Sequence, residues 1–282
     1  SLRQAKKTIV MVIYSLKDPR IIQNLNNKAK NGVAVTLICD REASAGVEKK
    51  LVPQIDLCFR SSKGLMHDKL IIIDKEQVWI GSANFTHDSL KSHFNLMEHL
   101  RCPEVAALVL EKALQFKGNH LEKPLKRFSY SISGQKSELI FLPDDQEAVP
   151  KLAQLIDSAK KTVRVAMYTI TRSDLAEKLI AAKKRGVDVQ VAIDQSTSQN
   201  ASKKIVQLLN KNKVPLFFNS GNELLHHKYL LVDDKILAHG SANWTVAAFK
   251  QNDDCIMIHY DLTKEQKWVV NEAWRRIIAS KP

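Results

Sequence analysis

The sequence predicts an α/β fold made of two similar halves, each layered around a parallel or mixed β-sheet. Runs of β-branched residues alternate with helical patterns along the chain, which is typical of strand–helix–strand units. Two blocks of the first half, beginning at Thr8 and Gly32, recur in the second half at an offset of 154 residues. The 282 residues are enough for two domains that each bury a core.

The first half contains its expected elements in a clear order. β-Branched runs predict strands at 8–14 and 33–39, and the apolar periodicity between them predicts a helix at 21–31 that stops at a glycine. A closing helix is predicted at 104–116, where Pro103 suits the first helical position.

The second half repeats this order and adds to it. Its matching strands and helices are predicted at 162–168, 175–185, 187–193 and 264–279. A strand at 139–142 and a helix at 147–160 come before this series, and the first half has no counterpart of either. We therefore expect that sequence upstream of Ser1 is missing, including any segment that would direct secretion or membrane association. The predicted domains are residues 1–125 and 137–282, joined by a linker at 126–136.

A longer repeat carries chemically reactive side chains. It reads His-x-Lys, four residues, Asp, six residues and Gly-Ser-x-Asn, with identical spacing in both copies. The first copy consists of His67, Lys69, Asp74, Ser82 and Asn84, and the second of His226, Lys228, Asp233, Ser241 and Asn243. Two copies at corresponding points of two halves indicate one active site built from both.

The alternation of side chains along a strand separates the repeated residues into two groups. His67 and Lys69 are two residues apart on a predicted strand and therefore share a face. Asp74 is seven residues from His67 and falls on the opposite face, and Asp233 has the same relation to His226. We expect the histidines and lysines to line the site, and both aspartates to anchor a charge or a turn away from it.

Two lysines that converge with two histidines repel a divalent cation and attract an anion. A phosphoryl group fits, because its oxygens need positive charge and hydrogen-bond donors. Lys69 and Lys228 would supply the charge, and Asn84 and Asn243 the amide donors. The side chains of Ser82 and Ser241 are supporting candidates. With this charge supply, no metal or other cofactor is required.

Two histidines can divide the labour of phosphoryl transfer. One attacks phosphorus as the neutral imidazole, and the other protonates the leaving alcohol. The second nitrogen of each ring needs an acceptor to orient it, and we assign this role to Asp254 and Glu98. Tyr14 and Tyr168 end matching strands, and either line the site or belong to the core. The remaining histidines considered are expected to be packed or solvent-tipped: His87, His93, His99, His227 and His239.

The repeated motif resembles the HKD signature of the phospholipase D superfamily, and the resemblance covers nearly the whole sequence. It implies a pseudo-twofold pair of α/β/α sandwich domains, each with a mixed sheet, and an active site at their interface. It also implies a metal-independent, two-step reaction through a phosphohistidine. In the two-copy lipases of the superfamily the first histidine is generally the nucleophile, which would make His67 the nucleophile and His226 the acid. With both copies in one chain, no dimer is needed to complete the site.

Charge and composition bound the substrate without selecting one. The net charge of +13 favours anionic partners such as nucleic acid or an anionic membrane surface. No run of 18 apolar residues is present. The leading prediction is a phosphodiesterase that hydrolyses a phospholipid headgroup. The alternatives are a nuclease acting on DNA or RNA, a phosphatidyl transferase, and a non-catalytic anion-binding scaffold on the same fold.

Overall fold

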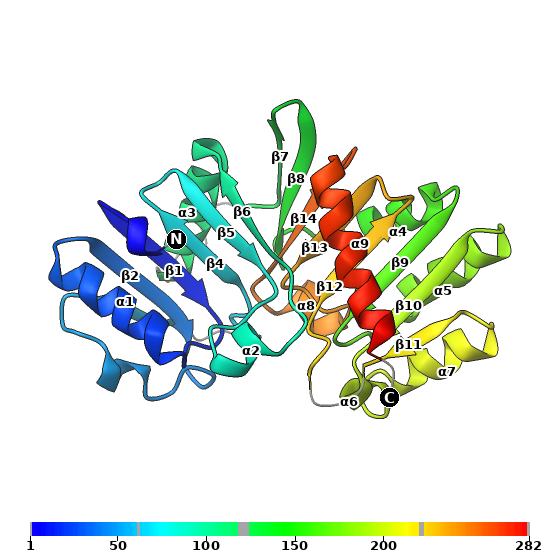
Figure 1. Cartoon of the computed structure of the whole chain (residues 1–282), viewed down its shortest axis with the longest axis horizontal. Helices are drawn as coiled ribbons and strands as arrows, with labels where there is room; N and C mark the ends of the chain where they lie inside the picture. Colours follow the sequence, from blue (N-terminus) through cyan, green and yellow to red (C-terminus); the bar gives the residue numbers. More distant parts are fainter. Residues whose placement is uncertain (1, 61–62, 118–123, 220–222, 281–282) are drawn as a thin grey trace.

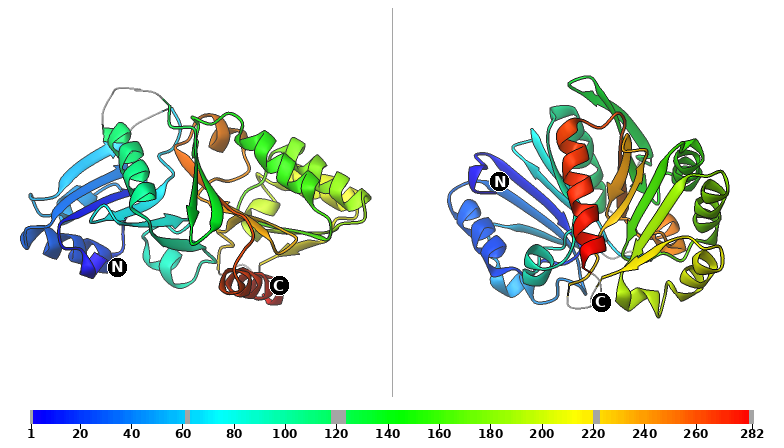
Figure 2. Two further views of the ribbon diagram at one scale, coloured as in Figure 1. Left: turned by 90° about the horizontal axis from the view of Figure 1, so that it is seen from above. Right: turned by 45° about the vertical axis from the view of Figure 1, so that its right-hand side comes forward.

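A computed structural model describes residues 2–60, 63–117, 124–219 and 223–280, and shows two α/β halves lying side by side (Figures 1 and 2). The strands of the first half are β1 (Thr8–Ile13), β2 (Ala34–Asp40), β3 (Asp56–Arg60), β4 (Lys69–Ile73), β5 (Gln77–Gly81) and β6 (Met97–Arg101). Its helices are η1 (Leu2–Gln4), α1 (Pro19–Lys30), η2 (Val47–Lys50), α2 (His87–Lys91) and α3 (Pro103–Lys117).

The second half begins with a strand pair and then repeats the order of the first. Its strands are β7 (Arg127–Ile132), β8 (Gln135–Leu142), β9 (Thr162–Met167), β10 (Asp188–Ile193), β11 (Leu216–Phe218), β12 (Lys228–Val232), β13 (Ile236–Gly240) and β14 (Asp254–His259). Its helices are α4 (Ala148–Ser158), α5 (Ser173–Lys184), α6 (Gln195–Ser198), α7 (Lys203–Lys211), α8 (Val246–Lys250) and α9 (Lys264–Ala279).

Both sheets are mixed and have matching strand orders. The first sheet runs β3-β2-β1-β4-β5-β6, and the second runs β11-β10-β9-β12-β13-β14-β8-β7. In each sheet the first three strands of this order are parallel, and the strands from β4 or β12 onward are antiparallel. The predicted fold, two related α/β domains with mixed sheets, is confirmed. Among the described residues, the first sheet has no counterpart of β8.

Residues 126–136 do not form the expected linker. They carry β7 and the turn into β8, and this hairpin extends the second sheet beyond β14. The segment alternates polar residues with Phe128 and Tyr130, which is the period of a half-buried strand. Tyr130 is buried, and Phe128 packs against the core of the first half. The hairpin therefore belongs to the folded body.

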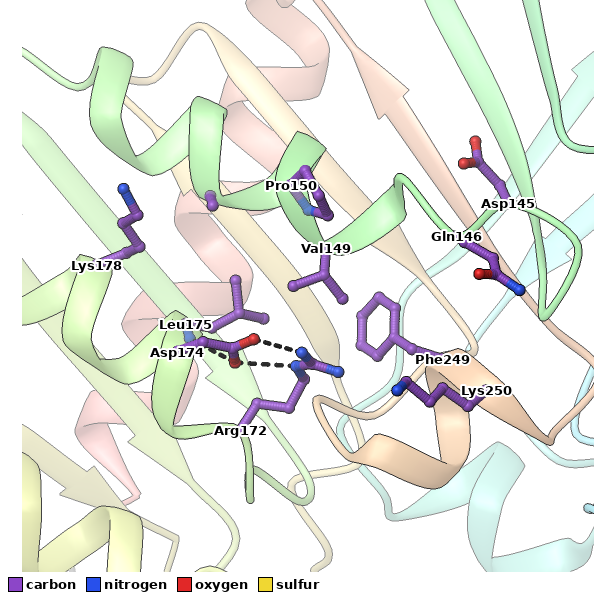
Figure 3. Close-up of a pocket in the computed structure, with 11 residues that line it drawn as sticks. Asp145, Gln146, Val149, Pro150, Arg172, Asp174, Leu175, Lys178, Phe249 and Lys250 are labelled. Atoms are coloured by element: carbon purple, nitrogen blue, oxygen red, sulfur yellow. Dashed lines mark hydrogen bonds and ion pairs between the residues drawn. The ribbon is translucent and has the colours of Figure 1, made fainter.

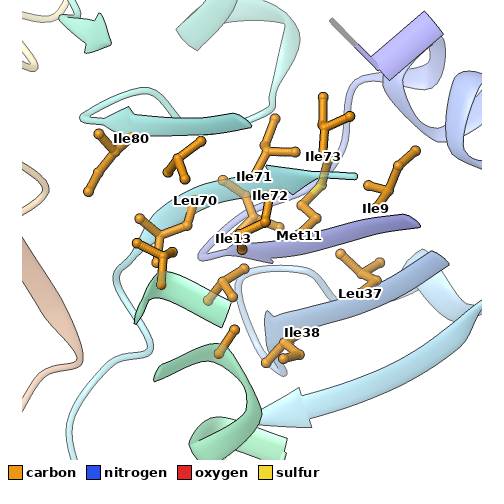
Figure 4. Close-up of a cluster of buried hydrophobic side chains, with 14 of the residues drawn as sticks. Ile9, Met11, Ile13, Leu37, Ile38, Leu70, Ile71, Ile72, Ile73 and Ile80 are labelled. Carbon is orange, nitrogen blue, oxygen red and sulfur yellow. The ribbon is translucent and has the colours of Figure 1, made fainter. Parts of the chain in front are cut away.

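Helices cover both faces of each sheet. In the first half α1 and α3 lie on opposite faces, and in the second half α9 lies opposite α5 (Figure 1). The apolar run Leu70–Ile73 on β4 is buried throughout, as expected for a strand covered on both sides. Figure 4 shows these side chains packed with Ile9, Met11 and Ile13 of β1. The two central strands of each sheet are thus rigid supports for the residues at their ends. No helix in the described part of the chain is long and apolar enough to cross a bilayer.

Candidate active site

The two motif histidines lie where the halves meet. His67 lies two residues before the start of β4. Its backbone N–H donates to the carbonyl of Asp253 in the other half at 2.8 Å. His226 has the same position before β12, and its N–H donates to the carbonyl of Phe94 at 3.0 Å. The strands begin at Lys69 and Lys228, two residues later than predicted, because the histidine backbones pair across the junction instead. Each histidine is therefore fixed by the half to which it does not belong.

Both motif lysines are buried beside the histidines. Lys69 and Lys228 expose 0% and 3% of their surface. Each ammonium donates to the carbonyl of its own motif histidine, and the Lys228–His226 bond measures 2.7 Å. Burial lowers the pKa of Lys69 to about 8, and burial together with the charge of Lys69 lowers the pKa of Lys228 well below its usual value. An anion between the two desolvated amines would oppose this lowering and favour their charged forms.

The same electrostatics show that the two copies converge. Burial lowers the pKa of His67, and the charges of Lys69 and of Lys228 from the other half lower it further. Burial lowers the pKa of His226 more strongly, with Lys228, Lys69 and His67 acting in the same direction. Both imidazoles are therefore biased toward the neutral form that a nucleophile requires.

The two imidazoles differ in the partner that holds Nδ1. His67 Nδ1 contacts a carboxylate oxygen of Asp254 at 2.8 Å, whereas His226 Nδ1 contacts the amide oxygen of Asn95 at 3.0 Å. Both contacts cross between the halves. The assignment of Glu98 as the second orienting carboxylate was wrong. Asn95 lies eleven residues after Asn84, the spacing that separates Asp254 from Asn243, and this spacing was the overlooked signal.

The Gly-Ser pair of each motif supports these orienting residues. A Cβ at Gly81 would lie 2.2 Å from the carbonyl oxygen of Leu96, and one at Gly240 would lie 2.2 Å from that of Cys255. Only glycine allows so close an approach of the neighbouring chain. The approach brings the Ser82 hydroxyl within 2.9 Å of Asn95 Oδ1, and the Ser241 hydroxyl within 2.6 Å of Asp254 Oδ1. Both hydroxyls thus donate to the residues that orient the histidines.

Two tyrosine rings pack against the motif histidines and lysines. The ring of Tyr14 is 5.1 Å from that of His67, and the ring of Tyr168 is 5.1 Å from that of His226. The motif lysines lie over the same rings, Lys69 Nζ at 5.2 Å and Lys228 Nζ at 5.0 Å. The open choice between site and core is therefore decided in favour of the site.

The motif asparagines Asn84 and Asn243, together with His93, complete the surroundings of the two motif histidines. The side-chain oxygens of Asn84 and Asn243 are buried without a hydrogen-bond partner in the described part of the chain, although both residues are partly exposed. Polar groups left unpaired beside a site are suited to a ligand. The ring of His93, expected to be packed or solvent-tipped, lies 6.4 Å from that of His226.

The motif aspartates lie away from the histidines. Asp74 accepts the backbone N–H groups of Lys6, Lys7 and Thr8 at 2.7–3.2 Å. Asp233 accepts the corresponding N–H groups of residues 160–162 at 2.7–2.9 Å. Asp74 therefore connects the start of β1 to the C-terminal end of β4, and Asp233 connects the start of β9 to the C-terminal end of β12.

Two openings are lined by residues of the motifs or by residues that contact them. The Tyr14 cleft, about 540 Å³, is lined by residues of both halves that include Tyr14, Asn243, Arg41, Arg60 and Lys63 together with Asp40 and Glu42. The Trp268 groove, about 290 Å³, combines His93 and Asn95 with the apolar residues Phe94, Leu96, Trp268 and Val269. Trp268 is 64% exposed, and Val269 is 45% exposed. One opening is therefore rich in charge, and the other is largely apolar.

A larger cavity of about 610 Å³ contains none of the motif residues (Figure 3). It lies between α4, α5 and α8, where Arg172 donates to Asp174 at 3.0 Å and covers the ring of Phe249 at 5.3 Å. Neither His67 nor His226 lines this cavity.

Comparison with known proteins agrees with this geometry. A family model described as "Cardiolipin synthase, PLD-like domain" matches residues 1–115 and 152–276. The chain is 27% identical over 159 residues to a phospholipase D of Rickettsia bellii, covering 56% of this chain and 78% of the relative. It is 26% identical over 167 residues to the mitochondrial cardiolipin hydrolase of Xenopus laevis, covering 56% of this chain and 79% of the relative.

A solved structure extends the likeness in fold to both halves. The phosphatidylserine synthase of Haemophilus influenzae matches with a TM-score of 0.77 at 13% identity, over 99% of this chain and 82% of that chain. The family match covers most of both halves, including both copies of the motif. The chain therefore belongs to the phospholipase D superfamily, as a protein with two cardiolipin synthase/PLD-like domain segments.

Proposed function

We propose that the protein hydrolyses a phosphodiester through a phosphohistidine, with His67 as nucleophile and His226 as general acid. The observation that carries this assignment is the difference between Asp254 and Asn95. A carboxylate on Nδ1–H stabilises the positive charge that the His67 ring acquires when its other nitrogen binds phosphorus. A neutral amide on His226 leaves its imidazolium without that stabilisation, which makes it the stronger proton donor.

The reaction then proceeds in two balanced steps. The Nε2 lone pair of His67 attacks phosphorus, the bond from phosphorus to the leaving oxygen breaks, and His226 gives that oxygen its proton. In the second step neutral His226 takes a proton from water, the resulting hydroxide attacks phosphorus, and the phosphorus–nitrogen bond breaks to restore His67. We assign the non-bridging oxygens to Lys69, Lys228 and the amides of Asn84 and Asn243. The two lysines supply the positive charge that a metal would otherwise provide.

We propose a phospholipid as the substrate. The Trp268 groove supports this choice, because it places exposed apolar side chains beside Asn95, the residue that orients His226. A tryptophan flanked by lysine and arginine on one helix suits the boundary between lipid tails and anionic headgroups. The relatives named phospholipase D and cardiolipin hydrolase agree with a lipid substrate.

A nuclease is the second candidate, supported by the Tyr14 cleft. Arg41, Arg60 and Lys63 line this cleft beside Asn243, and the guanidinium of Arg41 covers the ring of Phe59 at 4.8 Å. A strand of nucleic acid could contact these cations through its phosphates. Transfer to an alcohol uses the same intermediate, with an alcohol in place of water. A scaffold without catalysis is disfavoured, because both copies keep their histidine and lysine.

A substrate panel tests the proposal. Purified protein is incubated in EDTA with vesicles containing phosphatidylcholine or cardiolipin, with single-stranded DNA and RNA, and with a soluble aryl phosphodiester. We expect turnover of the aryl compound and of a phospholipid, and none with the His67→Ala variant. Added glycerol that diverts the product would indicate a transferase. If none of these phosphodiesters is cleaved, the enzymatic proposal is refuted.

A further inference from the structure

Three potential metal ligands meet where the two halves face each other. Glu98 comes from β6 of the first half, and His239 and His259 come from β13 and β14 of the second. One carboxylate oxygen of Glu98 contacts His239 Nε2 at 3.0 Å and His259 Nε2 at 2.8 Å. Ligand atoms of the three residues all lie within 4.8 Å of one another. None of the hydrogen bonds described for this trio joins it to His67 or His226.

The registers of the sheet strands create this cluster. His259 pairs with Leu237, and His239 pairs with Met257, so the two histidines are diagonal neighbours on one face of the second sheet. Ser137 of β8 pairs directly with His259 on that face. Glu98 reaches the same face from the edge strand of the first sheet. Regular strands hold all three ligands, which gives the cluster the rigidity of a built site.

We infer that Glu98, His239 and His259 form a binding site for a zinc-class divalent cation that joins the two halves. Two imidazole nitrogens and one carboxylate oxygen are a donor set that zinc uses, with water as the fourth ligand. The site is distinct from the catalytic residues, which carry lysines where this cluster has none. It would stabilise the junction and take no part in the phosphoryl chemistry.

The surroundings of His259 match those of a metal ligand, whereas His239 Nδ1 is buried with no hydrogen-bond partner among the described residues. His259 Nδ1 lies 2.8 Å from the Ser137 hydroxyl oxygen, which can accept a hydrogen bond from Nδ1–H and so leave the Nε2 lone pair free for an ion. Both histidines are almost fully buried, at 3% and 2% exposure.

Entry of the ion requires only a small local change. The Nε2 protons must leave or move to Nδ1, and the ion replaces the two hydrogen bonds to Glu98. The nitrogen–oxygen separations of 2.8 and 3.0 Å would open to roughly 3.3 Å, the spacing of tetrahedral ligands about 2.0–2.1 Å from zinc. The two Nε2 atoms lie within 4.8 Å of each other and would have to reach the same spacing, which side-chain rotation can supply.

Calorimetric titration of the EDTA-stripped, dialysed protein with Zn²⁺ tests the inference. We expect one equivalent to bind, and the melting temperature to rise with it. Glu98→Gln and His239→Gln should lose this binding, and Ser137→Ala should weaken it by about 10–100-fold. His99→Gln is the matched control, because His99 is on the same strand but contacts Gln77 on the sheet's other face. This variant should bind Zn²⁺ like the unaltered protein.

Two results would overturn the inference. The first is that the EDTA-stripped protein binds no Zn²⁺. The second is that Zn²⁺ binding survives in His239→Gln and disappears in His226→Gln, which would place the ion at the catalytic histidines. Anomalous diffraction from Zn²⁺-soaked crystals of unaltered protein gives an answer even if a variant misfolds. The expected peak lies between Glu98, His239 and His259, and a peak elsewhere contradicts the site. Because these measurements are of binding, they can succeed or fail independently of the proposed catalytic activity.

Discussion

Replacing Asp254 with asparagine separates the charge of the orienting residue from its geometry. Asp254 Oδ1 contacts His67 Nδ1 at 2.8 Å and accepts the Ser241 hydroxyl at 2.6 Å, and an amide oxygen can keep both contacts. Asp254 Oδ2 is buried with no partner among the described residues, so the new amide nitrogen meets no established contact there. The substitution therefore removes mainly the negative charge beside His67.

The size of the effect follows from the lost charge. A hydrogen bond to a charged group is worth about 1.5–3 kcal/mol, compared with about 0.5–1.5 kcal/mol for a neutral one. If this difference of about 1.0–1.5 kcal/mol is expressed in the transition state, kcat falls by about 5- to 12-fold, since about 1.4 kcal/mol corresponds to a factor of ten. The Coulombic attraction of Asp254 opposes the lowering of the His67 pKa, so the variant should have a still lower His67 pKa.

The pH profile supplies a second, independent readout. His67 attacks only as the neutral imidazole, which predominates above its pKa. Lowering that pKa should move the acid limb of kcat/KM for a soluble aryl phosphodiester to lower pH, even as the plateau falls. Asp253→Asn is the matched control, because Asp253 is the adjacent carboxylate and its side chain pairs with Arg60 at 3.2 Å. Equal kcat values for both variants, or a trapped phosphoryl group on His226, would refute the assignment of His67 as nucleophile.

Four further predictions concern the lysines, the anchoring aspartates, the metal and the lipid surface. Lys69→Met should lower kcat by about 10²–10³-fold, as for loss of one transition-state donor, and rates close to those of the unaltered protein would remove Lys69 from the chemistry. Asp233→Ala should cost about 1–3 kcal/mol in the free energy of unfolding and leave kcat on the aryl substrate unchanged. Burial raises the pKa of Asp233, but the backbone hydrogen bonds outweigh burial and lower it. The stabilisation by Asp233 is therefore present at neutral pH and is lost as the pH falls through that lowered pKa. EDTA should lower the melting temperature of Zn²⁺-loaded protein without reducing turnover measured well below that temperature; lost turnover would contradict a metal-free reaction. Trp268→Ala should weaken binding to anionic vesicles about tenfold or more, since burial of a large apolar side chain is worth about 1.5–3 kcal/mol, and should spare the aryl substrate; unchanged vesicle binding would exclude the Trp268 groove from lipid docking.

The sequence predicted the parts of the protein that depend on local pattern and repetition. Helix α9 begins and ends at the predicted residues, because its periodicity and capping signals lie within the segment itself. The face argument for Asp74 and Asp233 likewise needed only the alternation of a strand. The strand at 139–142 was predicted and lies within β8, but β7 and the start of β8 were missed. Their charged and polar residues resemble a linker until the edge of the second sheet is present to pair with them.

Contacts between the two halves could not be predicted from the sequence pattern. Glu98 was chosen as an orienting residue for its charge, whereas the backbone approach at Gly81 brings Asn95 to His226. His239 looked like an ordinary packed histidine, because its partner Glu98 is 141 residues away in the sequence. Such pairs are visible only when two sheets are placed face to face.

The backbone bonds that cross at His67 and His226 also constrain how the two halves can move relative to each other. Any hinge opening between the halves would break the His67–Asp253 and His226–Phe94 bonds and separate each imidazole from Asp254 or Asn95. Under the proposed mechanism, the site must therefore stay assembled throughout a turnover. We expect substrate to enter and product to leave through the flanking openings, without a hinge closure of the two halves.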